Sequence, residues 1–151
     1  MTQGQVTVED IRRCLGAKGK ACVIEVEKGM IKKLAEAVED PNPLWQDEEI
    51  AKKSIYGSIV APPSLQATVM MSGAPTRPDV PLMPRILDGG GEWEYYLPIR
   101  PGDVITCVTK LAEVTERETK SGKMVFLRFE TTHTNEKNEL VGKSISTLIT
   151  Y

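Results

Sequence analysis

The sequence predicts an α+β fold in which a curved antiparallel sheet wraps around a central helix. Apolar residues recur at helical spacing in the first half, whereas the last part holds runs rich in Val, Ile and Thr. Short turns join these runs, so neighbouring strands are expected to be antiparallel. An almost entirely apolar helix is available to cover the sheet. A chain of 151 residues is expected to form one domain over residues 1–151.

Composition argues against several classes of function. The net charge is -2 and the Lys and Arg residues are scattered, so nothing indicates a nucleic-acid partner. Three Cys and a single His, without a CxxC pair, argue against a zinc-type metal site and a disulfide framework. The sequence shows neither the apolar segment of a signal peptide nor a run long enough to span a membrane. We therefore expect a soluble, cytoplasmic protein without a metal or a membrane partner.

A short helix is expected to open the fold, because Thr7 is a suitable N-cap and Val8 and Ile11 begin an apolar face. Residues 21–26 (ACVIEV) are expected to form a strand. The clearest helix covers residues 31–38, where apolar side chains lie at i, i+3, i+4 and i+7.

Asp40 follows that helix and lies at its C-terminus, where a carboxylate opposes the helix dipole. Pro41 and Pro43 end the helix, because proline disfavours helical backbone in the residue before it. The unfavourable position of the carboxylate requires a structural or chemical reason.

A further short helical turn is predicted for residues 47–53. Pro62 and Pro63 then suit the first turn of a helix that continues to residue 71. Its residues 65–71 (LQATVMM) are almost entirely apolar, so this helix is expected to be buried.

Residues 72–91 are predicted to be irregular, because they contain several prolines and end in a triple glycine. A loop of about 20 residues is uncommon in a compact domain and is often functional. The alternative is a proline-stiffened connector. The triple glycine lacks a partner lysine, so it indicates backbone freedom rather than a phosphate cradle. Strands are expected at residues 92–96, 103–115, 123–133 and 141–150.

Few residues are candidates for chemistry, because the sequence has no GxSxG or GxxxxGK[ST] motif. His133 lies in a predicted strand and is expected to be a surface or satisfied residue rather than a catalyst. Residues 40–45 (DPNPLW) hold a carboxylate and a carboxamide between prolines, which restrict the backbone around polar groups. They fit either a chemical site or a helix stop followed by an Asx turn.

Residues 40–45 resemble the motif D-x-N-P-[LIV]-H of the MaoC-like hydratases and dehydratases. The likeness continues in residues 56–63 (YGSIVAPP), 88–94 (DGGGEWE) and 98–103 (PIRPGD). The last two segments resemble the N-terminal, FAS1-like dehydratase branch of that family. The resemblance covers roughly residues 20–150 and implies a single hot-dog domain, which agrees with the order of helices and strands.

The resemblance also implies a lyase of fatty acid or lipid metabolism. Members of the family add or remove water across the α,β double bond of an acyl thioester, carried on coenzyme A or acyl carrier protein, with no other cofactor. In catalytic members the motif's aspartate and histidine form a general acid–base pair on one water, and the asparagine orients them. A backbone N–H at the start of the central helix polarises the thioester oxygen.

This chain departs from that pattern at two positions. Trp45 stands in the histidine position, and an indole cannot accept a proton from water. Pro62 aligns with the glycine at the start of the central helix and has no N–H to donate. Loss of one oxyanion donor alone costs about 100- to 1,000-fold in rate. Asp40 and Asn42 are retained, but the chain alone is expected to be a poor hydratase.

The favoured hypothesis is a degenerate, non-catalytic subunit of a heteromeric enoyl-CoA hydratase or 3-hydroxyacyl-thioester dehydratase. The resemblance implies that such a subunit forms a heterodimer or heterotetramer with a catalytic hot-dog partner and shapes the acyl pocket. Asp40 is the candidate catalytic residue. Asn42, Trp45, Pro62 and Pro63 are candidate substrate-binding residues, and the two prolines are expected to delay the central helix and widen the groove.

Two other functions remain open. The chain could be an independent homodimeric hydratase that uses Asp40 and Asn42, or an acyl-CoA-binding scaffold in a larger complex, such as one with a thiolase. A thioesterase is a weaker alternative, because no nucleophile or base can be placed. Trp45 also fits a packing role. Arg85 and Arg100 are candidate contacts for coenzyme A phosphates, or solvated loop residues.

Overall fold

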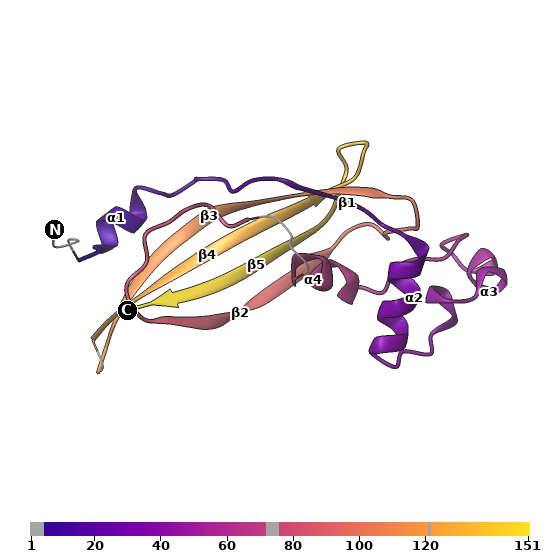
Figure 1. Cartoon of the computed structure of the whole chain (residues 1–151), viewed down its shortest axis with the longest axis horizontal. Coiled ribbons are helices and arrows are strands. Elements are labelled where there is room, and N and C mark those ends of the chain that lie inside the picture. The colour runs from indigo at the N-terminus through magenta and orange to yellow at the C-terminus, as the bar shows by residue number, and fades with distance from the viewer. Residues whose placement is uncertain (1–4, 72–75, 121) are drawn as a thin grey trace.

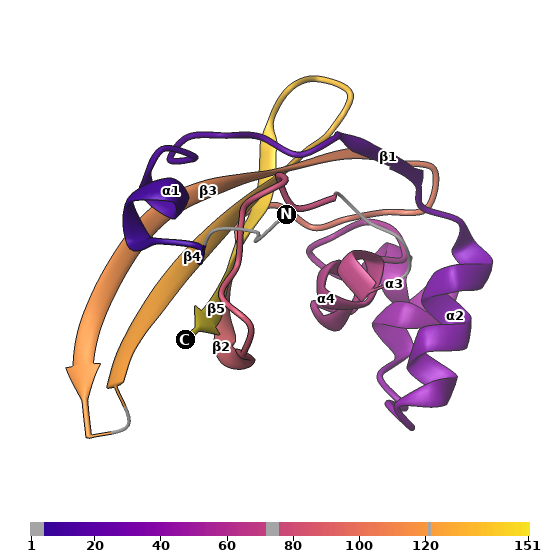
Figure 2. The same cartoon turned by 60° about the vertical axis from the view of Figure 1, so that its left-hand side comes forward.

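A computed structural model describes residues 5–71, 76–120 and 122–151, without the side chains of residues 68–71. It contains a five-stranded antiparallel sheet with strand order β1-β3-β4-β5-β2, which curls into a half-barrel (Figures 1 and 2). The strands are β1 (Cys22–Glu25), β2 (Ile86–Tyr95), β3 (Val104–Thr119), β4 (Gly122–Thr134) and β5 (Leu140–Thr150). The helices are α1 (Val8–Arg12), α2 (Lys28–Ala37), the 3₁₀ turn η1 (Pro43–Trp45), α3 (Glu48–Lys53) and α4 (Ser64–Met71). The predicted α+β class is therefore confirmed.

Helix α4 lies in the hollow of the curled sheet, as Figure 2 shows. Leu65 is 2% exposed and packs in one core cluster with Ile105 of β3 and Val141 of β5. Gln66 beside it is also buried. The prediction of a buried central helix is confirmed for this first turn, and the side chains of residues 68–71 lie outside the described part.

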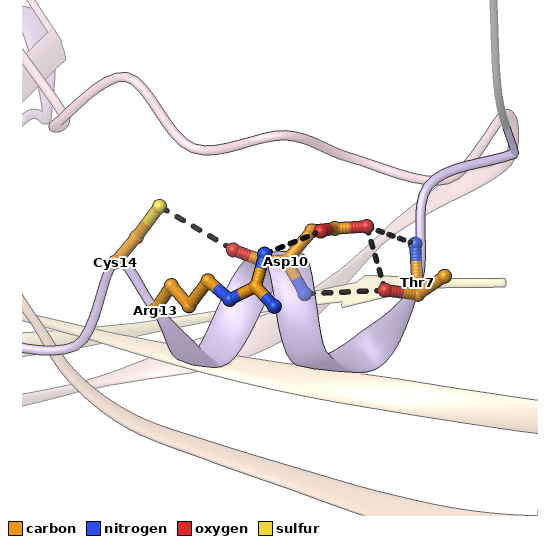
Figure 3. A network of polar contacts seen from close by, with 4 residues as sticks. All are labelled: Thr7, Asp10, Arg13 and Cys14. Atoms are coloured by element: carbon orange, nitrogen blue, oxygen red, sulfur yellow. Dashed lines mark hydrogen bonds and ion pairs between the residues drawn. The ribbon is translucent and has the colours of Figure 1, made fainter.

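Helix α1 lies at the other end of the sheet from α2 and α3 (Figure 1) and is held by a capping box. Thr7 Oγ1 accepts a hydrogen bond from the Asp10 N–H at 3.2 Å, and Asp10 Oδ2 accepts from the Thr7 N–H at 3.0 Å (Figure 3). The Thr7 hydroxyl also donates to Asp10 Oδ2 at 2.6 Å and holds the pKa of Asp10 below its usual value. Helix α1 ends at Arg12, earlier than its apolar pattern indicates, because the chain then joins the sheet, where Gly16 N donates to Leu111 O.

Strand β2 begins at Ile86, so the prediction that residues 72–91 are irregular is wrong for residues 86–91. The triple glycine lies inside the strand. Its pairing with β5 shifts register between Asp88 and Gly91, and Gly90 has φ of +91°. Glycine adopts this backbone without steric cost, so the strand continues through a bulge instead of ending. The left-handed backbone of Gly90 agrees with the interpretation of the triple glycine as backbone freedom.

Residues 76–85 run along the sheet before β2. Val80, Leu82 and Met83 pack against a second core cluster that includes Ile11 and Phe129. The described part of this segment therefore covers apolar surface of the sheet, as a connector would, while residues 72–75 lie outside the described residues. The strands predicted at 103–115, 123–133 and 141–150 are confirmed, and β3 continues to Thr119.

No described helix combines the length and the apolar character that a membrane span requires.

Candidate functional site

The segment that follows α2 is positioned by the way in which that helix ends. The Asp40 N–H donates to the Ala35 carbonyl at 2.9 Å, and the Glu39 N–H donates to the Glu36 carbonyl at 3.2 Å. This pair of bonds is a Schellman motif, and Glu39 adopts the left-handed backbone that the motif requires, with φ of +54°. The end of the helix thus fixes where the backbone of Asp40 begins.

The Asp40 side chain turns away from the helix and organises the next residues. Its Oδ1 accepts a hydrogen bond from the Asn42 N–H at 3.0 Å, and its Oδ2 accepts from the Trp45 indole Nε1 at 2.8 Å. The Gln46 side-chain amide donates to the Asp40 carbonyl at 3.0 Å. These bonds explain the carboxylate at a helix C-terminus, because it serves the loop that follows rather than the helix. Each carboxylate oxygen is engaged by the protein.

The side chain of Asn42 stabilises the turn that follows it. Its Oδ1 accepts a hydrogen bond from the Leu44 N–H at 3.0 Å and caps the 3₁₀ turn η1. The Asx-turn interpretation of residues 40–45 is thus confirmed. Asp40 Oδ1 and Asn42 Oδ1 each accept a hydrogen bond from the backbone N–H two residues ahead.

The residues that lead into α4 supply few backbone hydrogen-bond donors for a developing negative charge. The Ala61 N–H donates to the Ile99 carbonyl at 2.8 Å, and neither Pro62 nor Pro63 has an N–H. The Leu65 N–H donates to the Pro62 carbonyl at 2.9 Å within the first turn. Positions 61–63 therefore present no free backbone N–H to act as an oxyanion donor.

A cavity of about 280 Å³ lies beside this segment. Most of its wall is aromatic or proline, and it includes Trp45, Pro62, Pro63, Gln66, Tyr95 and Tyr96. Three of the predicted pocket residues, Trp45 and the two prolines, are therefore brought together. Asp40 and Asn42 do not line the cavity, and Asp40 is linked to it through the Trp45 indole. Trp45 also packs against the core cluster around α4, as its packing interpretation expects.

A second cavity, of about 350 Å³, has three cationic side chains in its wall, those of Lys28, Lys52 and Arg100. Lys28 pairs with Glu48 in its wall. The Arg100 guanidinium donates to the Ser58 hydroxyl at 3.2 Å. Arg85 lies elsewhere, with its guanidinium carbon 5.8 Å from the centre of the Tyr151 ring. The two candidate arginines are thus in separate places, and Arg100 is the one beside a cavity.

His133 is 1% exposed in β4 and is satisfied inside the fold, as the sequence indicates for a strand histidine. Its Nδ1 lies 3.2 Å from Cys107 Sγ, and its Nε2 lies 3.5 Å from Ser144 Oγ. Burial lowers the pKa of His133. Burial, with a smaller contribution from Cys22, raises the pKa of the Cys107 thiol to about 12. A neutral imidazole beside a protonated thiol fits a structural role.

Gln66 is the residue that sequence reasoning missed. It is 4% exposed, it lines the 280 Å³ cavity, and its Oε1 has no hydrogen-bond partner among the described residues. The available signal was one carboxamide inside the otherwise apolar run 65–71. Within the described part of the chain, no group of three or more His, Cys, Asp or Glu residues is placed to hold a metal ion.

Comparison with protein families shows a match over most of the chain. The profile of the family described as FAS1-like, dehydratase domain region, matches residues 13–144. A UPF0336 protein from Thermobifida fusca is 34% identical over 94 residues, which are 60% of this chain and 62% of that protein. The 3-oxo-4,17-pregnadiene-20-carboxyl-CoA hydratase alpha subunit from Mycobacterium tuberculosis is 29% identical over 123 residues, 73% of this chain and 40% of that subunit. The chain spans less than two thirds of the length of these curated relatives.

Solved structures share the fold. The MaoC-like dehydratase from Rhodospirillum rubrum superposes with a TM-score of 0.73 at 26% identity, covering 91% of this chain and 92% of the other. A chain of the ChsH1-ChsH2 complex from Mycobacterium tuberculosis gives 0.75 at 22% identity, covering 95% and 88%. A chain of the HadBC (3R-hydroxyacyl-ACP dehydratase) complex from the same organism gives 0.68 at 20% identity, covering 90% and 96%.

Proposed function

The chain belongs to the FAS1-like dehydratase domain family and has the hot-dog fold of the MaoC-like dehydratases, and from this premise we propose that it is the non-catalytic subunit of a heteromeric acyl-thioester hydratase or dehydratase. One observation carries the proposal: the Trp45 indole donates to Asp40 Oδ2 at 2.8 Å. The indole occupies the carboxylate oxygen that would otherwise hold a water, and it has no lone pair with which to take a proton.

The start of α4 supports the same role. A thioester oxygen that gains negative charge needs a nearby hydrogen-bond donor, and positions 61–63 have no free backbone N–H to supply one. The acid–base pair and the oxyanion donor would therefore both come from a partner subunit.

The edge of the sheet supports a partner of the same fold. Strand β2 is the last strand in the sheet order, so one of its backbone edges has no strand beside it among the described residues. Trp93 and Tyr95 are 42% and 47% exposed on this strand. A free strand edge with exposed aromatic side chains is suited to pairing with another chain. The relatives in heteromeric complexes, ChsH1-ChsH2 and HadBC, provide the precedent for such an arrangement.

In this proposal the chain forms part of the wall of the acyl pocket and supplies no catalytic group. Trp45, Pro62 and Pro63 line the 280 Å³ cavity beside Tyr95 and so lie next to the strand that the partner would meet. The substrate would be an acyl group on coenzyme A or acyl carrier protein, with no other cofactor. The cationic second cavity, which includes Arg100, is available to the carrier's phosphates.

The test is purification of this chain from its own cell extract under mild conditions, followed by native mass spectrometry. We expect a fixed ratio with a second small protein that carries an intact aspartate–histidine motif. The complex should hydrate enoyl-CoA, and the chain alone should not. Recovery of the chain only with itself, together with turnover that is lost in Asp40→Asn, would instead support a homodimeric hydratase. Binding of acyl-CoA without turnover in any complex would support a scaffold module.

A further inference from the structure

The side-chain amide of Gln66 is buried without a complete set of partners. The residue is 4% exposed, and its Oε1 accepts no hydrogen bond from the residues that the structure describes. A buried amide oxygen without a donor costs free energy, and such groups in folded proteins usually have a reason to persist. Gln66 sits in the first turn of α4, on the wall of the 280 Å³ cavity.

The other side of the amide is closed by the sheet. A Cβ atom placed on Gly142 would lie 2.1 Å from Gln66 Oε1 and 2.8 Å from Gln66 Cδ. The carboxamide therefore rests directly on the backbone of β5, in space that only a glycine leaves open. Gln66 Nε2 would lie 2.7 Å from the same Cβ atom, so both ends of the amide face the strand, and the residue also lines the 280 Å³ cavity. Recognition of a ligand by Oε1 would require a turn about the last side-chain bond, which has no steep rotamer preference.

We propose that Gln66 determines the specificity of this pocket, by accepting a hydrogen bond from a hydroxyl or N–H group on a bulky, otherwise apolar acyl chain. The inference rests on the proposed function for the acyl thioester itself, and it adds the kind of acyl group. The wall is mostly aromatic and proline, including Trp45, Tyr56, Pro62 and Tyr96, and therefore suits an apolar body. The unsatisfied atom is an acceptor, so the matching ligand group is a donor.

The pocket would discriminate between acyl groups because a ligand without a donor leaves Gln66 Oε1 unpaired. A purely apolar acyl group would fill the cavity but leave Oε1 buried and unpaired. An acyl group with a hydroxyl would pair it. One hydrogen bond of this kind corresponds to about a tenfold difference in affinity, and sites with a committed polar group reject unmatched ligands more strongly.

The experiment measures binding of two matched probes to the complete chain. The probes are the N-acetylcysteamine thioesters of cyclohexanecarboxylic acid and of 4-hydroxycyclohexanecarboxylic acid. The chain contains two Trp residues, so Trp93→Phe leaves Trp45 in the cavity wall as the single fluorescent reporter. We expect the hydroxylated probe to bind about tenfold more tightly. In Gln66→Leu the two affinities should become equal, and in Gln66→Glu, which keeps an acceptor, the preference should persist.

One further measurement tests the role of Gln66 without any variant. In the unmodified chain, the hydroxylated probe should shift the NMR signals of the Gln66 side-chain amide more than the apolar probe does. A small cavity of about 10 Å³ beside Gln66 and His133 is near the lower limit for one water. Equal binding of both probes would mean that such a water already satisfies Oε1, and this result would overturn the proposal. Failure of both probes to bind would overturn it as well.

The two proposals fail in different assays. Probe binding needs neither a partner subunit nor turnover. A hydroxyl preference that depends on Gln66 would therefore stand even if no catalytic partner were found. Turnover by a complex with equal binding of both probes would leave the proposed function intact and remove only the role of Gln66.

Discussion

The indole Nε1 of Trp45 donates a hydrogen bond to Asp40 Oδ2 at 2.8 Å, so the residue in the histidine position of the motif satisfies the motif's own aspartate. The same bond ties the 3₁₀ turn η1 back to the end of α2, across residues 40–45. The position that, by the resemblance to the MaoC-like motif, carries the histidine of catalytic members is thus occupied by a residue that holds the loop.

Replacement of Trp45 by Phe should lower the free energy of unfolding by about 1.5–3 kcal/mol, because a hydrogen bond to a carboxylate is lost while the aromatic packing is largely kept. Urea denaturation of the isolated chain measures the change. Trp93→Phe is the matched control, since Trp93 is 42% exposed on β2, and it should change stability by less than about 0.5 kcal/mol. Equal losses in both variants would mean that the bond to Asp40 contributes nothing.

Conversion of the site toward the catalytic pattern should require two changes. Trp45→His supplies a base beside Asp40, and Pro62→Gly supplies a backbone N–H at the start of α4. We expect no hydration of crotonyl-CoA by the wild-type chain or by either single variant, and measurable hydration only in the double variant. Loss of crotonyl-CoA absorbance gives the rate. Turnover in Trp45→His alone would show that Pro62 does not limit the chemistry.

Acid should destabilise the fold through His133. Burial lowers its pKa in the folded state, so the unfolded chain binds the proton more tightly. Stability should therefore be constant above about pH 6.5, the usual histidine pKa, and fall as the pH drops below it. His133 is the single histidine of the chain, which makes this window specific to it. Thermal unfolding between pH 5 and 7 should show the slope, and His133→Gln should flatten it.

Relief of the left-handed backbone at Glu39 should stabilise the end of α2. Its φ is +54°, a conformation that costs a non-glycine residue about 1 kcal/mol. Glu39→Gly should raise the free energy of unfolding by roughly 0.5–1 kcal/mol, measured in urea. Asn138, at φ of +60°, is the comparison, because asparagine tolerates this backbone. Asn138→Gly should gain less, and a loss of stability in Glu39→Gly would contradict the strain.

The contact between Gln66 and Gly142 should appear as coupling between two substitutions. Gly142→Ala places a Cβ 2.1 Å from Gln66 Oε1 and should cost about 1–3 kcal/mol, because the buried amide must move. In a Gln66→Ala background the space is open, so the same substitution should cost less. A coupling free energy below about 0.5 kcal/mol in the double-mutant cycle would mean that the two sites are independent.

Local patterns predicted most of the elements. Alternating β-branched residues predicted β3, β4 and β5, and the spacing of Ile31, Leu34 and Ala35 predicted α2. The start of β2 was missed, because a triple glycine indicates a break, and only pairing with β5 carries the strand through Gly90. Such pairing is a tertiary effect that a local pattern does not contain.

In the candidate site, too, local features could be predicted from the sequence and tertiary contacts could not. The motif at residues 40–45 and the missing N–H at Pro62 could be predicted from residue types alone. The direction of the Trp45 indole, and hence its bond to Asp40, depends on the backbone of the 3₁₀ turn η1. The unsatisfied Oε1 of Gln66 could not be predicted, because Gln66 packs against Gly142, which is far away in sequence and meets it only where α4 lies on the sheet.

The strand order has a consequence for how the chain is made in the cell. Strand β2 ends at Tyr95, whereas its hydrogen-bonded neighbour β5 begins at Leu140. Because synthesis proceeds from the N-terminus, β2 leaves the ribosome well before the strand that pairs with it. During that delay it has two open edges and exposed aromatic side chains, which favour wrong pairing and aggregation. Simultaneous production of the proposed partner subunit should therefore raise the yield of folded chain.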